Sequence, residues 1–109
     1  MSIVVNIYYT GKNGSARKFV DEMVSSQTVQ KIRAEEGNER YEYFMPLGNQ
    51  ETVLLIDAWK DQESIDKHHA SSMMDTITKL RNKYDLHMKV ERYISDEEMP
   101  NTDKEFIRT

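Results

Sequence analysis

Residues 35–69 read EEGNERYEYFMPLGNQETVLLIDAWKDQESIDKHH, and this stretch decides the fold. The aromatic-rich run 41–45 and the run 52–59, which is the most apolar run of the chain, are both typical of β-strands. The polar segment 48–51 between them predicts a turn. We therefore expect two neighbouring strands here, and we expect the rest of the chain to cover them.

The second of these runs leads directly into a helix that carries two histidines. Asp61 stands where its carboxylate can accept hydrogen bonds from the free N–H groups of a helix start. The helix behind it contains His68 and His69, and the strand before it ends in Trp59, the only tryptophan. We expect the functional site where the indole ring, an imidazole and a cavity meet.

The other elements follow from the periodicity of apolar residues. Ser15 is expected to cap the first helix and Gly37 to end it. The serine pair 25–26 weakens the first helix and either interrupts it, with the pattern resuming at Val29, or leaves it continuous, whereas the pair 71–72 is expected to kink the second helix. The predicted elements are a strand at 2–10, a helix at 16–36, a helix at 61–84 and a strand at 86–94.

The resulting order, β-α-β-β-α-β, predicts an α+β protein of the ferredoxin-like type, an antiparallel sheet with two helices on one face. Residues 53–56 are all apolar, so both faces of that strand need covering. Because the helices can cover only one face, we expect a homodimer. The domain is expected to occupy residues 1–94, and the polar segment 95–109 to form a tail that is either mobile or packed on the partner subunit.

Composition narrows the classes of partner and site. The chain has 109 residues, a formal net charge of −4 and 31% charged residues. An acidic protein without a basic run is not attracted to nucleic acid or to anionic membranes. The absence of cysteine excludes disulfides and thiolate chemistry. With no signal peptide and no apolar run long enough to span a membrane, we expect a cytoplasmic protein.

Several blocks of residues, in this order, resemble the antibiotic biosynthesis monooxygenase (ABM) domain family. The resemblance covers nearly all of residues 2–93. The matching blocks are the first strand with Asn6, IRAEEGN (32–38), RYEYF (40–44), VLLIDAWKDQESIDKHH (53–69) and KYDLHMKVERY (83–93).

This resemblance implies a dimeric α+β barrel with a pocket between sheet and helices in each subunit. Several members oxygenate phenols or quinols with O2 and without metal or flavin. Other members isomerise a phosphorylated signalling sugar, and one branch degrades haem. His68 matches the helix histidine of the family, and Asn6 and Trp59 match strand positions that border the pocket in many members.

The sequence also departs from the family pattern. Many relatives carry a second histidine one turn further along the helix, where this chain has Met73. The haem-degrading branch has a tryptophan and, ten residues later, a histidine at the places held here by His68 and Thr78. The resemblance to the haem-degrading branch therefore lacks its key ligand.

The resemblance makes His68 the expected general base, since an imidazole titrates near working pH, and the alternative from the residues alone is a partly exposed helix histidine without a role. Helical periodicity places His69 on the apolar stripe instead, and adjacent helical residues point about 100° apart, so we expect only one of them to face the pocket. Trp59 either lines the pocket or anchors the core or a dimer interface. Asn6 either holds a substrate oxygen or satisfies the backbone. The tyrosines Tyr41, Tyr43 and Tyr93 are expected at the sheet surface or at an interface, with donation of a hydrogen bond to a substrate as the alternative.

No metal or cofactor is expected. His68 and His69 are adjacent rather than four residues apart, and the four glycines form neither a dinucleotide fingerprint nor a P-loop. These absences fit a cofactor-independent enzyme and a non-enzyme equally well, and it is the resemblance that implies a cofactor-independent monooxygenase acting on a small aromatic quinol or phenol. The alternatives are an isomerase of a small hydroxy-ketone or sugar phosphate, with Arg33, Lys60 and Arg92 as possible cationic groups, and a non-catalytic module that binds a small ligand.

Overall fold

A four-stranded antiparallel sheet forms the centre of the protein. The computed structural model describes residues 1–109. Its strands are β1 (Ile3–Thr10), β2 (Asn38–Phe44), β3 (Thr52–Trp59) and β4 (His87–Ile94), in the order β2-β3-β1-β4. Every neighbouring pair is antiparallel. The predicted α+β, ferredoxin-like arrangement is confirmed, with the apolar strand β3 and strand β1 at the centre.

Each of the two expected long helices is broken into two shorter ones. The helices are α1 (Ser15–Ser25), α2 (Thr28–Arg33), α3 (Gln62–His69) and α4 (Ser72–Lys83), with a single turn, α5 (Asn101–Lys104), near the C-terminus. The first break lies at Gln27, whose φ of 63° is left-handed, and the second at Ala70 and Ser71. The prediction of one helix over 61–84 was therefore wrong, because the chain makes a full break where only a kink was expected.

Two predicted helix caps have different outcomes. Asp61 caps α3 as expected, since its carboxylate accepts from the Ser64 N–H at 2.9 Å. Ser15 does not cap α1: the helix begins at Ser15 itself, and its hydroxyl accepts from the Lys12 N–H at 3.0 Å. Gly14, with φ 78°, occupies the cap position instead.

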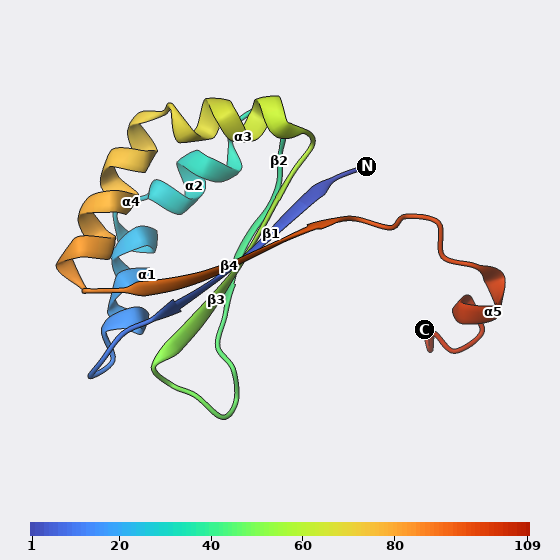
Figure 1. Cartoon of the computed structure of the whole chain (residues 1–109), viewed down its shortest axis with the longest axis horizontal. Helices are drawn as coiled ribbons and strands as arrows, with labels where there is room; N and C mark the ends of the chain where they lie inside the picture. The colour runs from blue at the N-terminus through green and yellow to red at the C-terminus, as the bar shows by residue number, and fades with distance from the viewer.

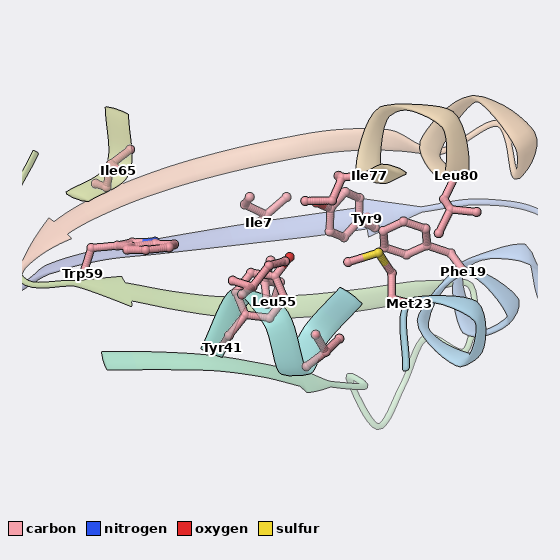
Figure 2. Close-up of a cluster of buried hydrophobic side chains, with 12 residues drawn as sticks. Ile7, Tyr9, Phe19, Met23, Tyr41, Leu55, Trp59, Ile65, Ile77 and Leu80 are labelled. Atoms are coloured by element: carbon pink, nitrogen blue, oxygen red, sulfur yellow. The ribbon is translucent and has the colours of Figure 1, made fainter. Parts of the chain in front are cut away.

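Helices α1 to α4 all lie on one side of the sheet (Figure 1). The core fills the space between them and the sheet, and Figure 2 shows its side chains, including Tyr9, Phe19, Leu55 and Trp59, packed between the two layers. These four side chains are at most 1% exposed. Full burial of each large apolar side chain contributes roughly 1.5–3 kcal/mol, so the helix layer is held firmly on the sheet.

The opposite face of the sheet carries no helix. The strand pairings place Val4, Tyr8, Leu54 and Ile56 together on that face, and all four side chains are partly exposed. Phe44 and Tyr93, near the two edges of the same face, are 39% and 51% exposed. We call this set of side chains the open face.

After β4 the chain leaves the body of the protein. The last backbone hydrogen bond between this end of the chain and the body of the protein joins the Ser95 N–H to the Ser2 carbonyl at 2.9 Å. The segment then runs outward and ends in α5, well away from the sheet (Figure 1). Its apolar side chains Met99, Phe106 and Ile107 are 47%, 88% and 53% exposed. Docking of this tail on a partner subunit stays a prediction.

Candidate active site

A cavity of about 260 Å³ lies between the helix-covered face of the sheet and helices α3 and α4. Eleven of its sixteen lining residues are hydrophobic, so the wall is mainly apolar with a few polar groups, as is usual for small-molecule sites. The polar and aromatic lining residues are Tyr9, Tyr41, Asp57, Trp59, His68, His69, Arg81 and Arg92.

His68 lies in the last turn of α3 and is only 5% exposed. Its Nδ1 lies 2.8 Å from Oε2 of Glu35. A carboxylate partner selects the tautomer in which Nδ1 carries the hydrogen, so Nε2 is left with a free lone pair. Burial lowers the pKa of His68, while the charge of Glu35 opposes that shift. The net shift is downward, so the imidazole is neutral at neutral pH and can accept a proton.

Glu35 was not singled out by the sequence analysis, although it belongs to the block that carries the resemblance. It stands between α2 and β2, and its side chain is 16% exposed. Gly37 fixes this connection: its φ is 85°, and a Cβ there would lie 2.0 Å from the Ser64 hydroxyl on α3. The Gly37 carbonyl also accepts from the Lys60 N–H at 2.8 Å. This close approach holds Glu35 beside His68.

Trp59 packs directly against the base. The centroids of the indole and imidazole rings are 4.8 Å apart, with an angle of 32° between the planes. The indole N–H donates to Oδ1 of Asp57, two residues earlier on β3. Trp59 therefore does both things that the sequence left open, since it is a core side chain at 1% exposure and also lines the cavity.

Asp57 is a second residue that sequence reasoning missed. It is 7% exposed, and burial is the main reason why its pKa rises to about 7. The negative charge of Glu35 raises the pKa further, whereas the hydrogen bond from Trp59 and the positive charge of Arg81 lower it. A carboxyl group with this pKa is present in both protonation states at neutral pH.

Arg81 and Tyr9 stand together on another part of the cavity wall. The guanidinium Nη2 donates to the Tyr9 hydroxyl at 2.8 Å, while the buried Nε has no hydrogen-bond partner. Burial raises the pKa of Tyr9, so the phenol keeps its proton. This pair adds one fixed positive charge and one neutral hydroxyl group to the apolar cavity.

Both helix histidines line the cavity, so the expectation that only one of them would face it was wrong. Their ring centroids are 5.9 Å apart. His68 is buried and paired with Glu35, whereas His69 is exposed and makes no hydrogen bond within the chain. The argument for His69 assumed one continuous helix with a single apolar stripe. Because α3 ends at His69, that stripe does not continue into α4.

Asn6 lies on the other side of the sheet from this site. The alternation of β1 turns Val5, Ile7 and Tyr9 toward the cavity, and Asn6 belongs to the open face, where it pairs with Ile56 of β3. Its Oδ1 is buried and has no hydrogen-bond partner within the chain. The structure thus brings His68 and Trp59 together but leaves Asn6 apart from them.

The first of two expectations for Tyr41, a place at the sheet surface or at an interface, was wrong, because the residue is 2% exposed and lines the cavity. The alternative, donation to a substrate, stays a prediction. β2 is paired so that Tyr41 lies opposite Asp57, on the helix-covered face. Tyr93, by contrast, is 51% exposed on the open face.

No group of three or more His, Asp and Glu side chains is arranged to hold a metal ion. The helices are also too short or too polar for any of them to cross a lipid bilayer.

Comparison with known proteins relates this chain to one family. Residues 2–80 match the family model described as antibiotic biosynthesis monooxygenase. The Bacillus subtilis (strain 168) protein named "Putative monooxygenase YcnE" is 33% identical over 70 residues, which are 64% of this chain and 72% of that protein.

Solved structures show the same fold at lower identity. A putative antibiotic biosynthesis monooxygenase from Deinococcus radiodurans superimposes with a TM-score of 0.76 at 15% identity, covering 90% of this chain and 96% of the other. SnoaB, a cofactor-independent oxygenase from Streptomyces nogalater, gives 0.72 at 13% identity, covering 91% and 97%. At these identities the likeness concerns the fold alone.

Proposed function

Because the chain belongs to the antibiotic biosynthesis monooxygenase family, we propose that it oxygenates a small aromatic quinol or phenol with O2, with His68 as the general base. The family match and the monooxygenase relative support a monooxygenase-like activity. No cofactor is part of the proposal, since a deprotonated quinol can itself supply the electrons that O2 accepts.

The observation that carries the proposal is a neutral histidine at the wall of an apolar cavity. Glu35 holds Nδ1 of His68, so Nε2 is the atom free to take the hydroxyl proton of a substrate. Removal of that proton turns a quinol into an electron-rich anion. Trp59, whose ring packs against the same imidazole, also lines this apolar cavity.

The size and polarity of the cavity favour an aromatic substrate over a sugar phosphate. An apolar cavity of about 150 Å³ is known to bind benzene, and the present one is larger, at about 260 Å³. Of the three cationic groups suggested for an isomerase, only Arg92 lines the cavity, and the other cation there, Arg81, is bonded to the Tyr9 hydroxyl. Arg33 is instead bonded to the Tyr41 carbonyl, at 2.7 and 2.9 Å.

We also propose that the protein is a homodimer joined through the open face. Apolar side chains gather there without a covering layer, and the buried amide oxygen of Asn6 lacks a partner within the chain. A second copy of the face would bury the apolar side chains and could supply a donor to that oxygen. In this arrangement Asn6 has a structural role.

The test is protein-dependent O2 uptake with naphthohydroquinone, corrected for spontaneous oxidation. We expect uptake by the wild-type protein and a loss of about a hundredfold or more for His68→Gln, in the range of typical general-base contributions. His69→Gln is the matched control and is expected to retain most of the uptake.

Three results would contradict the proposal or part of it. No uptake above the spontaneous rate would leave the isomerase and ligand-binding alternatives for this cavity. Uptake that His68→Gln does not change would remove His68 from the mechanism. Loss in His69→Gln alone would transfer the role of base to His69.

A further inference from the structure

Asp57 is the only carboxyl group among the residues that line the cavity, and the function proposed above does not use it. It lies near the end of β3, and Trp59 contacts both Asp57 and His68, since its N–H donates to the carboxyl group and its ring packs against the imidazole. A buried acidic group that faces a ligand cavity is costly to keep, so a chemical role is the natural explanation.

The two oxygens of Asp57 have different surroundings. Oδ1 accepts the indole N–H of Trp59, which fixes the orientation of the carboxyl group. Oδ2 makes no hydrogen bond within the chain. It is also absent from the polar atoms that are both fully buried and without a partner, so part of its surface is open. It is therefore the oxygen that a molecule in the cavity can reach.

Charged and titratable groups face Asp57 from the α2–β2 connection, from α3 and α4, and from strands β1 and β2. Glu35 approaches from the α2–β2 connection and Arg81 from α4, and the two act on its pKa in opposite directions. Tyr9 on β1 and Tyr41 on β2 face it as neutral phenols, because burial raises the pKa of both. The groups from α3 are His68, which is neutral, and His69 at the exposed end of the helix.

We propose that Asp57 is the general acid of the oxygenation, and that it donates a proton to the oxygen that leaves when the O–O bond of the intermediate breaks. The proposal rests on the function proposed above, with His68 as the base. Trp59 is a positioning residue, since its N–H holds the carboxyl group and its ring packs on the imidazole.

The steps balance for naphthohydroquinone. His68 takes a hydroxyl proton, the ring carbon of the resulting anion forms a bond to O2, and the distal oxygen receives the proton back from His68, which gives a hydroperoxide. His68 then removes the hydrogen from the carbon that bears the hydroperoxide. The C–H electrons form a carbonyl, the O–O bond breaks, and the departing hydroxide takes the proton of Asp57 and leaves as water.

In total, naphthohydroquinone and O2 give hydroxynaphthoquinone and water, and the substrate supplies all the electrons. The proton held by His68 returns to Asp57 and restores both groups. When no acid protonates the departing oxygen, the hydroperoxide instead expels hydrogen peroxide and gives naphthoquinone. The acid thus decides between two product pairs, and this difference can be measured.

The experiment compares wild-type protein, Asp57→Asn and the control Asp66→Asn, an exposed aspartate on α3. An asparagine retains an oxygen that can accept the Trp59 N–H but cannot give up a proton in the same way. We measure hydroxynaphthoquinone formed per O2 consumed, with hydrogen peroxide assayed by O2 return on addition of catalase. The protein-free reaction is subtracted from both quantities, and the corrected ratio is then unaffected by a partial loss of folded protein.

We expect the ratio to fall about tenfold or more in Asp57→Asn, with a matching rise in hydrogen peroxide, because a positioned acid accelerates its step by roughly 10²–10⁴-fold. The control should keep the wild-type ratio. An unchanged ratio in Asp57→Asn would overturn the role of Asp57 while leaving the oxygenase function intact. Absence of uptake in the wild type would overturn the oxygenase function itself, and the role of Asp57 with it.

A second measurement needs no variant. After the protein-free reaction at each pH is subtracted, the wild-type ratio of hydroxynaphthoquinone to O2 should fall as the pH rises through about 7, because Asp57 then loses the proton that it donates. Protein-dependent O2 consumption should rise over the same range, since more substrate is ionised. A ratio that stays constant between pH 6 and 9 would contradict the proposal even if Asp57→Asn failed to fold.

Discussion

At the scale of single residues, the pair formed by Glu35 and His68 predicts a shift in pH dependence. Glu35→Gln removes a negative charge 2.8 Å from the imidazole, and that charge raises the pKa of His68. We therefore expect the acidic limb of the kcat/KM profile to move to lower pH, and kcat at neutral pH to fall about tenfold because the imidazolium loses its stabilising partner. The exposed neighbour Glu36 supplies the control Glu36→Gln. An unmoved limb would show that Glu35 does not set the basicity of His68.

The buried carboxyl group of Asp57, which the proposed reaction needs as an acid, is expected to destabilise the fold when it is ionised. Its pKa is about 7 in the folded protein and near 3.8 when unfolded, so the folded state holds more protons between those values. Stability contributed by this group is present below pH 4 and is lost as the pH rises toward 7. Asp57→Asn should therefore stabilise the protein at pH 8 by on the order of 2–4 kcal/mol, and much less at pH 5. Urea unfolding at the two pH values measures this difference, and equal gains at both would contradict it.

The sequence identified His68 and Trp59 as members of the site but not the groups that tune them. His68 and Trp59 could be found because they are rare residues at a strand–helix junction. Glu35 lies 33 positions from His68, and nothing local marks a glutamate in an acidic chain as the partner of a distant imidazole. Asp57 looked like one polar residue of a strand. The placement of Asn6 on the open face follows from the strand alternation, which the sequence did show.

At the scale of elements, the close approach of Gly37 to α3 predicts that any side chain at this position of the α2–β2 connection lowers the stability of the protein. Gly37→Ala adds a Cβ 2.0 Å from the Ser64 hydroxyl at a φ of 85°. Gly14→Ala is the matched control, because its φ is 78° and no other atom lies within 4 Å of the added Cβ. The control should cost about 1 kcal/mol for the left-handed backbone alone, and Gly37→Ala about 2 kcal/mol or more. Equal losses on urea unfolding would mean that the close approach to α3 is not needed.

The strands were predicted more successfully than the helices. Apolar alternation predicted β1 and β4 and separated their two faces without showing which face turns toward the helices, and the order of elements predicted the sheet. The serine pairs indicated where both helices are interrupted but not the backbone conformation, since Gln27 adopts a left-handed conformation that glycine or asparagine would normally signal. At the second break, the Ser71 hydroxyl donates to the His68 carbonyl at 2.6 Å, so a side chain satisfies the last turn of α3 and lets the chain turn away.

At the scale of the whole molecule, the open face predicts the oligomeric state. One chain has a mass of 12.9 kDa, and we expect sedimentation equilibrium to give twice that value for the wild type. Ile56→Asp places a charge in the middle of the open face and should yield monomers, because an unpaired charge is costly at an apolar interface. Val24→Asp, at an exposed site on α1, is the control. A wild-type monomer, or a dimer that survives Ile56→Asp, would contradict the proposed interface.

The single tryptophan of this chain lies between the proposed base and the proposed acid, stacked on one and hydrogen-bonded to the other. Its fluorescence therefore comes from the site alone, with no background from other indoles. A protonated imidazole quenches a neighbouring indole, and an aromatic guest alters its emission. Unlabelled wild-type protein thus carries a built-in optical probe: a pH titration of its emission follows the charge of His68 and Asp57, and the addition of a trial compound reports occupancy before any turnover is sought.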